Sequence, residues 1–168
     1  MHEAEKIIAQ LGLESLPHEG GFFRQTWIAP RQAGETRAAA SAIHYLITRD
    51  SFSALHRLAM HETWHFYAGD PVRLVQLHPT GEITRVTLGG DVLTGQQPQC
   101  TVPAGTWQGA RLVDGAERGW ALLGCTVTPA WDEGDFELGE REELWREFPG
   151  AADEIARLTR LRGSRDDF

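Results

Sequence analysis

Short apolar runs separated by turn residues fill the middle of the chain, from residue 40 to about residue 128. Runs of four to eight residues bounded by Gly, Pro, Asn or Asp are typical of β-strands. Many short strands at this spacing predict an antiparallel sandwich or barrel. The expected strands are Ser41–Thr48, Ser53–Leu58, Thr63–Tyr67, Arg73–Leu77, Ile83–Leu88, Cys100–Val102, Gly109–Leu112 and Trp120–Val127.

The two ends of the chain have helical spacing instead. Apolar residues share one face over residues 2–11, which predicts a short amphipathic helix that ends at Gly12. After Asp135, apolar residues again recur at helical spacing, and we expect short helices between about residues 139 and 162. With no internal repeat and no linker, residues 1–168 predict a single domain whose barrel spans about residues 20–137.

Composition and charge exclude several partners. The chain has 168 residues, 41% hydrophobic and 24% charged, which is an ordinary globular composition. A formal net charge of -8 and the lack of a Lys/Arg cluster argue against nucleic acid and against an acidic membrane surface. No run approaches the roughly 18 apolar residues of a membrane span. Cys100 and Cys125 lie in apolar strand-like segments, so we expect buried free thiols and a cytoplasmic protein.

The densest group of chemically useful residues lies in FSALHRLAMHETWHFYAG, residues 52–69. It places His56 and Glu62 on two consecutive predicted strands, before a turn at Gly69. Residues two apart on a strand share a face, so His56 and Leu58 belong together, as do Glu62, Trp64 and Phe66. A histidine and a carboxylate that converge inside a barrel suit either metal binding or proton transfer.

These residues and the later VPAGTWQG, residues 102–109, resemble the two sequence motifs of cupins. The chain is more closely similar to the cupin-5 family, long called DUF985, over residues 5 to about 148. The similarity includes HEGGFFR, SAIHYLIT, the WHFYAGDP block, GCTVTPAW and DFEL. It implies an all-β, RmlC-like jelly-roll barrel (a double-stranded β-helix) flanked by short N- and C-terminal α-helices. It also implies a homodimer, whereas the activity of the family is poorly defined.

The resemblance bears directly on metal binding. A typical cupin metal site has three histidines and a glutamate, but Leu58 and Gln108 stand here where two of the histidines are usual. The remaining candidate ligands are His56, Glu62 and the amide oxygen of Gln108, a weaker set than transition metals normally require. No cofactor is therefore certain, and a divalent metal at this degenerate site stays an alternative.

A metal-free interpretation uses the same pair. A buried carboxylate orients an imidazole and raises its basicity, as a general base requires. The resemblance to metal-independent sugar-nucleotide epimerases of the superfamily implies a His56–Glu62 pair, with Tyr45 or Tyr67 as the acid. We therefore expect a small polar, sugar-like ligand and an isomerase or epimerase activity. A non-catalytic binding protein and a metal-dependent enzyme are the alternatives.

Other side chains are candidates for the pocket wall. Arg24 is expected either to anchor an anionic ligand or to form a structural ion pair, and His44 either lines the cavity or packs in the core. Tryptophan rings offer flat surfaces to a sugar or another ring. The predicted lining residues are Arg24, His44, Leu58, Trp64, Phe66 and Gln108.

Overall fold

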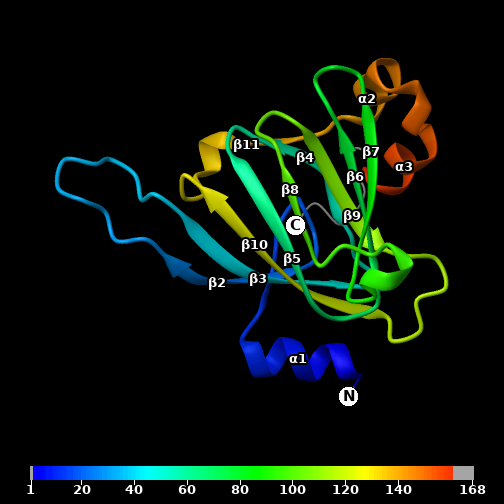
Figure 1. Ribbon diagram of the computed structural model, residues 1–168, viewed down its shortest axis with the longest axis horizontal. Coiled ribbons are helices and arrows are strands. Elements are labelled where there is room, and N and C mark those ends of the chain that lie inside the picture. The colour runs from blue at the N-terminus through cyan, green and yellow to red at the C-terminus, as the bar shows by residue number, and fades with distance from the viewer. Residues whose placement is uncertain (1, 161–168) are drawn as a thin grey trace.

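The computed structural model describes residues 2–160, in which the strands form two antiparallel sheets (Figure 1). The first sheet has the order β1 (Glu14–Ser15), β2 (Phe22–Ile28), β3 (Ser41–Thr48), β10 (Trp120–Thr128), β5 (His61–Gly69) and β8 (Gln99–Val102). The second has the order β11 (Phe136–Leu138), β4 (Ser53–Leu58), β9 (Trp107–Leu112), β6 (Val72–Leu77) and β7 (Ile83–Leu88).

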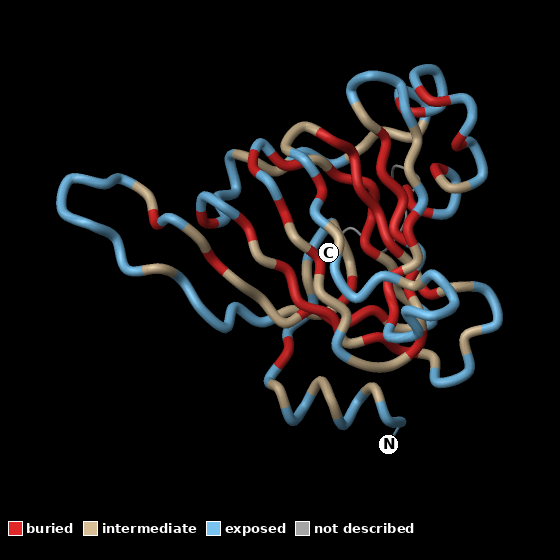
Figure 2. The backbone as a smooth tube through the Cα atoms, in the orientation of Figure 1, coloured by how far each residue is buried: buried red, intermediate tan, exposed pale blue. Residues whose placement is uncertain are grey.

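The core lies between the two sheets. Ile47 and Leu123 of the first sheet and Leu74 and Ala110 of the second have no exposed surface and belong to one apolar cluster. Figure 2 shows this buried layer along both sheets, with exposed backbone concentrated in the loops and helices. Alternation of side chains along each strand therefore gives every sheet an inner and an outer face.

The barrel is not closed. Among residues 2–160, only an isolated bridge between Leu88 and Gln97 pairs backbone of the second sheet with the segment that leads into β8 of the first. The jelly-roll fold that the sequence predicts is present in the form of two packed sheets. Residues of both sheets line a cavity.

Helices occur at both ends, as predicted. Helix α1 (Glu3–Leu11) ends at Gly12, whose φ of 61° is left-handed and suits glycine. Helices α2 (Arg141–Glu147) and α3 (Ala152–Arg157) flank the 3₁₀ turn Pro149–Ala151. Their apolar residues pack on the outer face of the second sheet, where they bury Leu55, Val75, Leu77 and Trp107. Residues 161 and 162 of the predicted second helix lie outside the described residues.

Most of the predicted strands agree with the structure, and Ser41–Thr48, Ser53–Leu58 and Ile83–Leu88 have the same bounds. The sequence reasoning did not define β1, β2 or β11, which lie in segments rich in glycine or acidic residues. In the described part of the chain, no helix is both long enough and apolar enough to cross a membrane.

Candidate functional site

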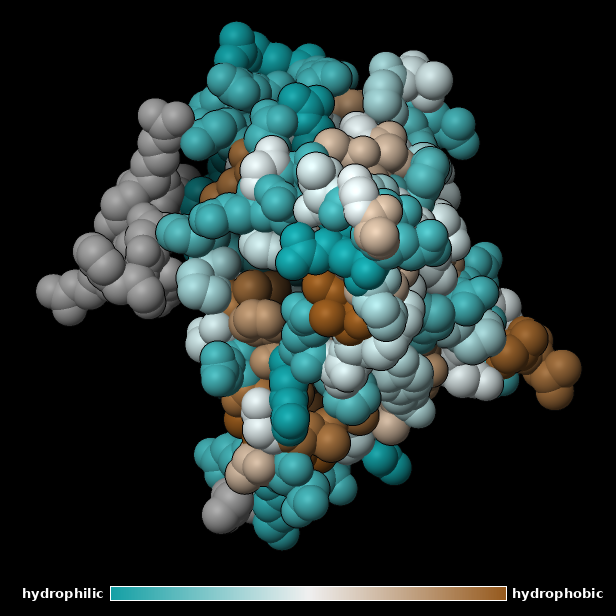
Figure 3. Space-filling view, turned by 90° about the vertical axis from the view of Figure 1, so that its left-hand side faces the viewer, coloured by the Kyte–Doolittle hydropathy of each residue, from teal (hydrophilic) through white to brown (hydrophobic). Residues whose placement is uncertain are grey.

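A cavity of about 450 Å³ lies between the sheets. Its wall combines apolar side chains of β2, β3, β4, β10 and β11 with a few polar groups, as is usual for small-molecule sites. Figure 3 views the molecule from the end at which the β2–β3 loop projects in Figure 1, and apolar surface is exposed there between polar patches. The polar wall residues on which the chemistry depends are Glu19, Gln25, Ser41, Tyr45, His56 and Glu62.

His56 is held in one orientation by its own strand. Its ring is 2% exposed, and Nδ1 lies 2.7 Å from the carbonyl oxygen of Ala54. Because a carbonyl can only accept, Nδ1 carries the hydrogen and the neutral ring has its lone pair on Nε2. The ring also stacks on Phe136, with centroids 5.3 Å apart. The imidazole therefore has a fixed tautomer and a free basic nitrogen.

Glu62 faces that basic nitrogen from the other sheet. Its Oε2 lies 4.0 Å from Nε2 of His56, is buried, and has no hydrogen-bond partner. Burial raises the pKa of Glu62 from 4.5 to about 7, although the nearby His56 acts in the opposite direction. Near neutral pH both forms of the carboxyl are present, so the pair can hold and release a proton.

The structure brings this predicted pair together but changes the role of Glu62. We expected the carboxylate to orient the imidazole, whereas the carbonyl of Ala54 does so. The 4.0 Å separation is too long for a direct hydrogen bond between Nε2 and Oε2. Two atoms that can exchange protons thus lie 4.0 Å apart in the wall of the cavity, where one ligand group can contact both.

Tyr45, one of the two tyrosines predicted as the acid, lines the cavity, but its proton has a partner. The hydroxyl donates to the carbonyl oxygen of Gly20 at 2.6 Å. Burial raises the pKa of Tyr45 well above 10, so the phenol stays protonated. Burial likewise raises the pKa of the Cys125 thiol beside Glu62. Both side chains therefore line the cavity as uncharged groups near pH 7.

Glu19 is a cavity residue that the sequence reasoning missed. It belongs to the HEGGFFR segment, and its Oε1 accepts a hydrogen bond from Ser53 Oγ at 2.7 Å. Its charge contributes to the raised pKa of Glu62. The adjacent His18 has a φ of 64°, unusual for a residue with a side chain. The Arg160 guanidinium holds this loop by donating to the carbonyls of His18 and Glu19.

Two predicted pocket residues lie outside the cavity. Phe23 and Gln25 line it, so the intervening Arg24 points to the outer face, where its Nη1 donates to Leu11 at 3.0 Å. His44 also lies on the outer face, and its ring meets the half-exposed ring of Tyr67 edge-on at 6.1 Å. The prediction that Arg24 and His44 line the pocket is wrong, and Tyr67 is not positioned as the acid.

The remaining predicted pocket residues either line the cavity or lie behind the residues that line it. Leu58 lines the cavity directly. Trp64 and Gln108 lie deeper, each 1% exposed, with Trp64 Nε1 donating to Gln108 Oε1 at 2.7 Å. The Gln108 amide lowers the pKa of Glu62 and so favours its charged form. Phe66 packs against the main core cluster and is not part of the wall.

A tight metal site does not fit this donor set. His56 and Glu62 offer one nitrogen and one carboxylate, Leu58 offers only hydrocarbon, and the oxygen of Gln108 already accepts from Trp64. In the part of the chain that the structure describes, no three His, Cys, Asp or Glu side chains converge on one point. Transition metals normally require more ligands of this kind.

The jelly-roll of two sheets, with a histidine and a glutamate facing an interior cavity, is that of a cupin. The sequence matches the family Cupin_5, cupin superfamily (DUF985), over residues 5–139, and the chain belongs to that family. A comparison with curated proteins gave no match.

Solved structures agree with this assignment. A Shewanella oneidensis protein is 33% identical, with a TM-score of 0.87 over 96% of this chain and 100% of its own. A hypothetical protein from Leishmania major is 30% identical, with a TM-score of 0.84 over 94% of this chain and 99% of its own.

A more distant cupin has a documented metal. Oxalate decarboxylase of Bacillus subtilis, which has Mn(II) centres, is 16% identical to this chain. The TM-score is 0.55 over 93% of this chain and 42% of that protein. At this identity the similarity shows the shared fold alone.

Proposed function

We propose that the protein binds a small polar molecule in the cavity and that His56 and Glu62 exchange protons with it without a metal. The reaction class is an isomerisation or epimerisation beside a carbonyl group. One observation supports this proposal above all: the buried, unpartnered Oε2 of Glu62 faces the lone-pair nitrogen of His56 across 4.0 Å. A carboxyl whose pKa is about 7 is well matched to acid–base work near neutral pH.

The proposed step needs no further reactant. With His56 neutral and Glu62 protonated, Nε2 accepts the proton of a carbon next to the carbonyl group. The C–H electron pair forms the enol double bond, and Glu62 donates its proton to the carbonyl oxygen. To regenerate a carbonyl compound, His56 returns its proton to a carbon of the enol while the enol hydroxyl returns its proton to Glu62, which restores the pair. In an epimerisation, water protonates the opposite face of the carbon instead, and His56 releases its proton to water.

The dimensions of the cavity support a ligand of sugar size. A volume of about 450 Å³ lies within the range of small-molecule sites. Gln25 and Ser41 supply hydrogen-bonding groups, and the half-exposed Trp131 is an aromatic lining residue on which a ring can stack. These features favour a sugar-like ligand over a purely apolar one.

A His56→Ala substitution tests the proton transfer. In D₂O, the wild-type protein is expected to introduce deuterium next to the carbonyl of a 4-keto sugar, measured by NMR. Loss of the base is expected to slow exchange by about 100-fold or more. His78→Ala is the control, because His78 contacts Thr84 outside the cavity and should leave the rate unchanged. Failure of the wild-type protein to exchange any of a panel of 4-keto sugars would contradict the catalytic proposal.

A non-catalytic binding protein is the second candidate. It is favoured by Tyr45, whose proton is directed to Gly20, so this predicted acid does not offer its proton to a ligand. Calorimetric binding of a keto sugar without deuterium exchange would identify a binder. Cytoplasmic location and a homodimer remain proposals: the two free cysteines suit a reducing compartment, and light scattering would give the mass of the assembly.

A further inference from the structure

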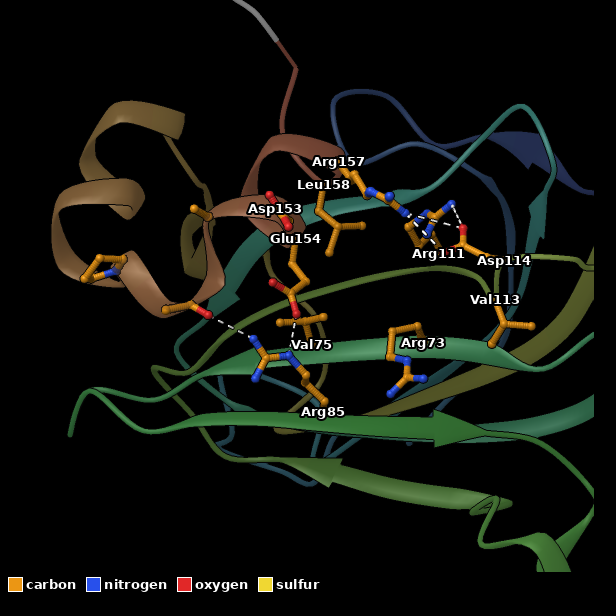
Figure 4. Close-up of a pocket in the computed structure, with 13 residues that line it drawn as sticks. Arg73, Val75, Arg85, Arg111, Val113, Asp114, Asp153, Glu154, Arg157 and Leu158 are labelled. Carbon is orange, nitrogen blue, oxygen red and sulfur yellow. Dashed lines mark hydrogen bonds and ion pairs between the residues drawn. The ribbon is translucent and has the colours of Figure 1, made fainter.

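A second cavity lies on the outer face of the second sheet (Figure 4). Strands β6, β7 and β9 form its floor, and the 3₁₀ turn Pro149–Ala151 and helix α3 form its wall. Its volume is about 700 Å³. Leu74 and Ala110 point into the core from β6 and β9, so their neighbours Arg73 and Arg111 point to this opposite side. This cleft is separate from the cavity that holds His56 and Glu62.

Four arginines surround the cleft: Arg73, Arg85 and Arg111 from three adjacent strands, and Arg157 from α3. The strand register places Arg73 directly opposite Arg111, and Val75 of the same strand directly opposite Arg85. Like charges directly opposite each other on neighbouring strands repel and destabilise a sheet. The arrangement therefore concentrates positive charge in a protein whose formal net charge is -8.

Carboxylates neutralise part of this charge. Arg85 forms an ion pair with Glu154 and donates to the carbonyl of Gly150 at 3.0 Å. Arg111 and Arg157 share Asp114, at 2.9 Å and 3.3 Å. Asp114 is 74% exposed, so solvent weakens both of these pairs.

Arg73 is different from the other three arginines. Among residues 2–160, its guanidinium forms no side-chain hydrogen bond and no ion pair, although its charge helps to lower the pKa of Glu154. In Figure 4 its guanidinium lies over the sheet, apart from those of Arg85 and Arg111, without a marked interaction. A guanidinium group that lies opposite a second arginine and donates no side-chain hydrogen bond of its own is suited to bind the oxygens of an anion.

We propose that this cleft binds a small phosphate-bearing molecule, with Arg73 and Arg111 donating to the phosphate oxygens. Planar guanidinium groups bind phosphate through paired hydrogen bonds, and two of them supply enough donors for one phosphoryl group. The carboxylates of Asp153 and Glu154 on the wall disfavour a long polyanion such as a nucleic acid. The volume of the cleft exceeds that of a phosphate ion and leaves space for an organic part.

Isothermal titration calorimetry with inorganic phosphate, pyrophosphate and a hexose phosphate, at one fixed ionic strength, tests the proposal. At least one of these anions should bind the wild-type protein, and Arg73→Gln should weaken that binding by about 10-fold or more. Arg111→Gln should weaken it as well. Arg31→Gln is the matched control, because Arg31 is an exposed arginine in the β2–β3 loop and removes the same charge elsewhere.

The titrations distinguish an organic phosphate from free phosphate, and both from the absence of a site. Tighter binding of the hexose phosphate than of inorganic phosphate supports an organic phosphate, and equal binding supports free phosphate as the ligand. Equal affinities for the wild-type, Arg73→Gln and Arg31→Gln proteins would overturn the site, as would absence of binding by all three anions at about 10 mM. Circular dichroism of each variant verifies that a loss of binding is not a loss of fold.

Discussion

The wild-type protein is expected to become less stable as the pH rises from mildly acidic to alkaline, and Glu62→Gln is expected to remove most of this pH dependence. The folded protein raises the pKa of this carboxyl from 4.5 to about 7, so it favours the protonated form. The stabilisation associated with that proton is complete below pH 4.5 and is lost as the pH rises through 7. Glutamine is neutral throughout and keeps the polar shape of the side chain.

The size of the effect follows from the shift in pKa. Between about pH 5 and about pH 8.5 the wild-type protein should lose about 2.5 kcal/mol more unfolding free energy than the variant. Urea unfolding at several pH values measures this difference. Glu82→Gln, at an exposed turn, should retain the wild-type slope. Parallel pH profiles for the wild-type and Glu62→Gln proteins would show that the carboxyl is not perturbed as described.

Trp64→Ala is expected to lower the unfolding free energy by about 4 kcal/mol, because it empties a large core volume. Trp64 is 1% exposed and packs edge-on against Tyr45, with ring centroids 5.8 Å apart. The substitution also removes the donor to Gln108 and leaves a buried amide oxygen without its partner. Both losses lie directly behind the His56–Glu62 pair.

Trp131→Ala provides the comparison for this prediction. Trp131 lines the cavity that holds His56 and Glu62 but is 53% exposed, and its removal should cost less than about 1 kcal/mol. Denaturant unfolding monitored by circular dichroism measures both variants on the same scale. Similar losses for the two tryptophans would mean that Trp64 does not occupy a closely packed site.

The fold and the His56–Glu62 pair were predictable from different features of the sequence. Short apolar runs with clear turns located β3, β4 and β7 with correct bounds. Strand alternation grouped Glu62 with Trp64, and the resemblance to the cupin motifs placed His56 and Glu62 on the inner sides of β4 and β5, which belong to different sheets. The family resemblance added the jelly-roll topology, which local patterns do not contain.

The errors at Arg24 and His44 also have a physical cause. In Ser41–Thr48 apolar side chains occur at both parities, so periodicity does not identify the inner face. The pairing of β2 with β3 then places Arg24 beside His44 on the same outer surface. Glu19 was missed because a loop has no periodicity from which the direction of a side chain can be inferred.

The arginine cleft could not be predicted from local sequence either. Its floor depends on the strand order β9-β6-β7, which brings Arg111 next to Arg73 although 38 positions separate them along the chain. Basic residues do not cluster along the sequence, so composition gives no sign of this cleft. Charge that gathers only through long-range pairing has no such local pattern.

The contact between Arg160 and the loop at His18 has a practical meaning for any laboratory that handles this protein. A polypeptide trimmed just ahead of residue 160 would retain every side chain that faces the interior cavity. It would nevertheless lack the anchor that holds the backbone of His18 and Glu19 in place. Proteolytic nicking near the carboxyl end can therefore mimic the effect of a substitution in the candidate site, and intact mass should be verified before variants are compared.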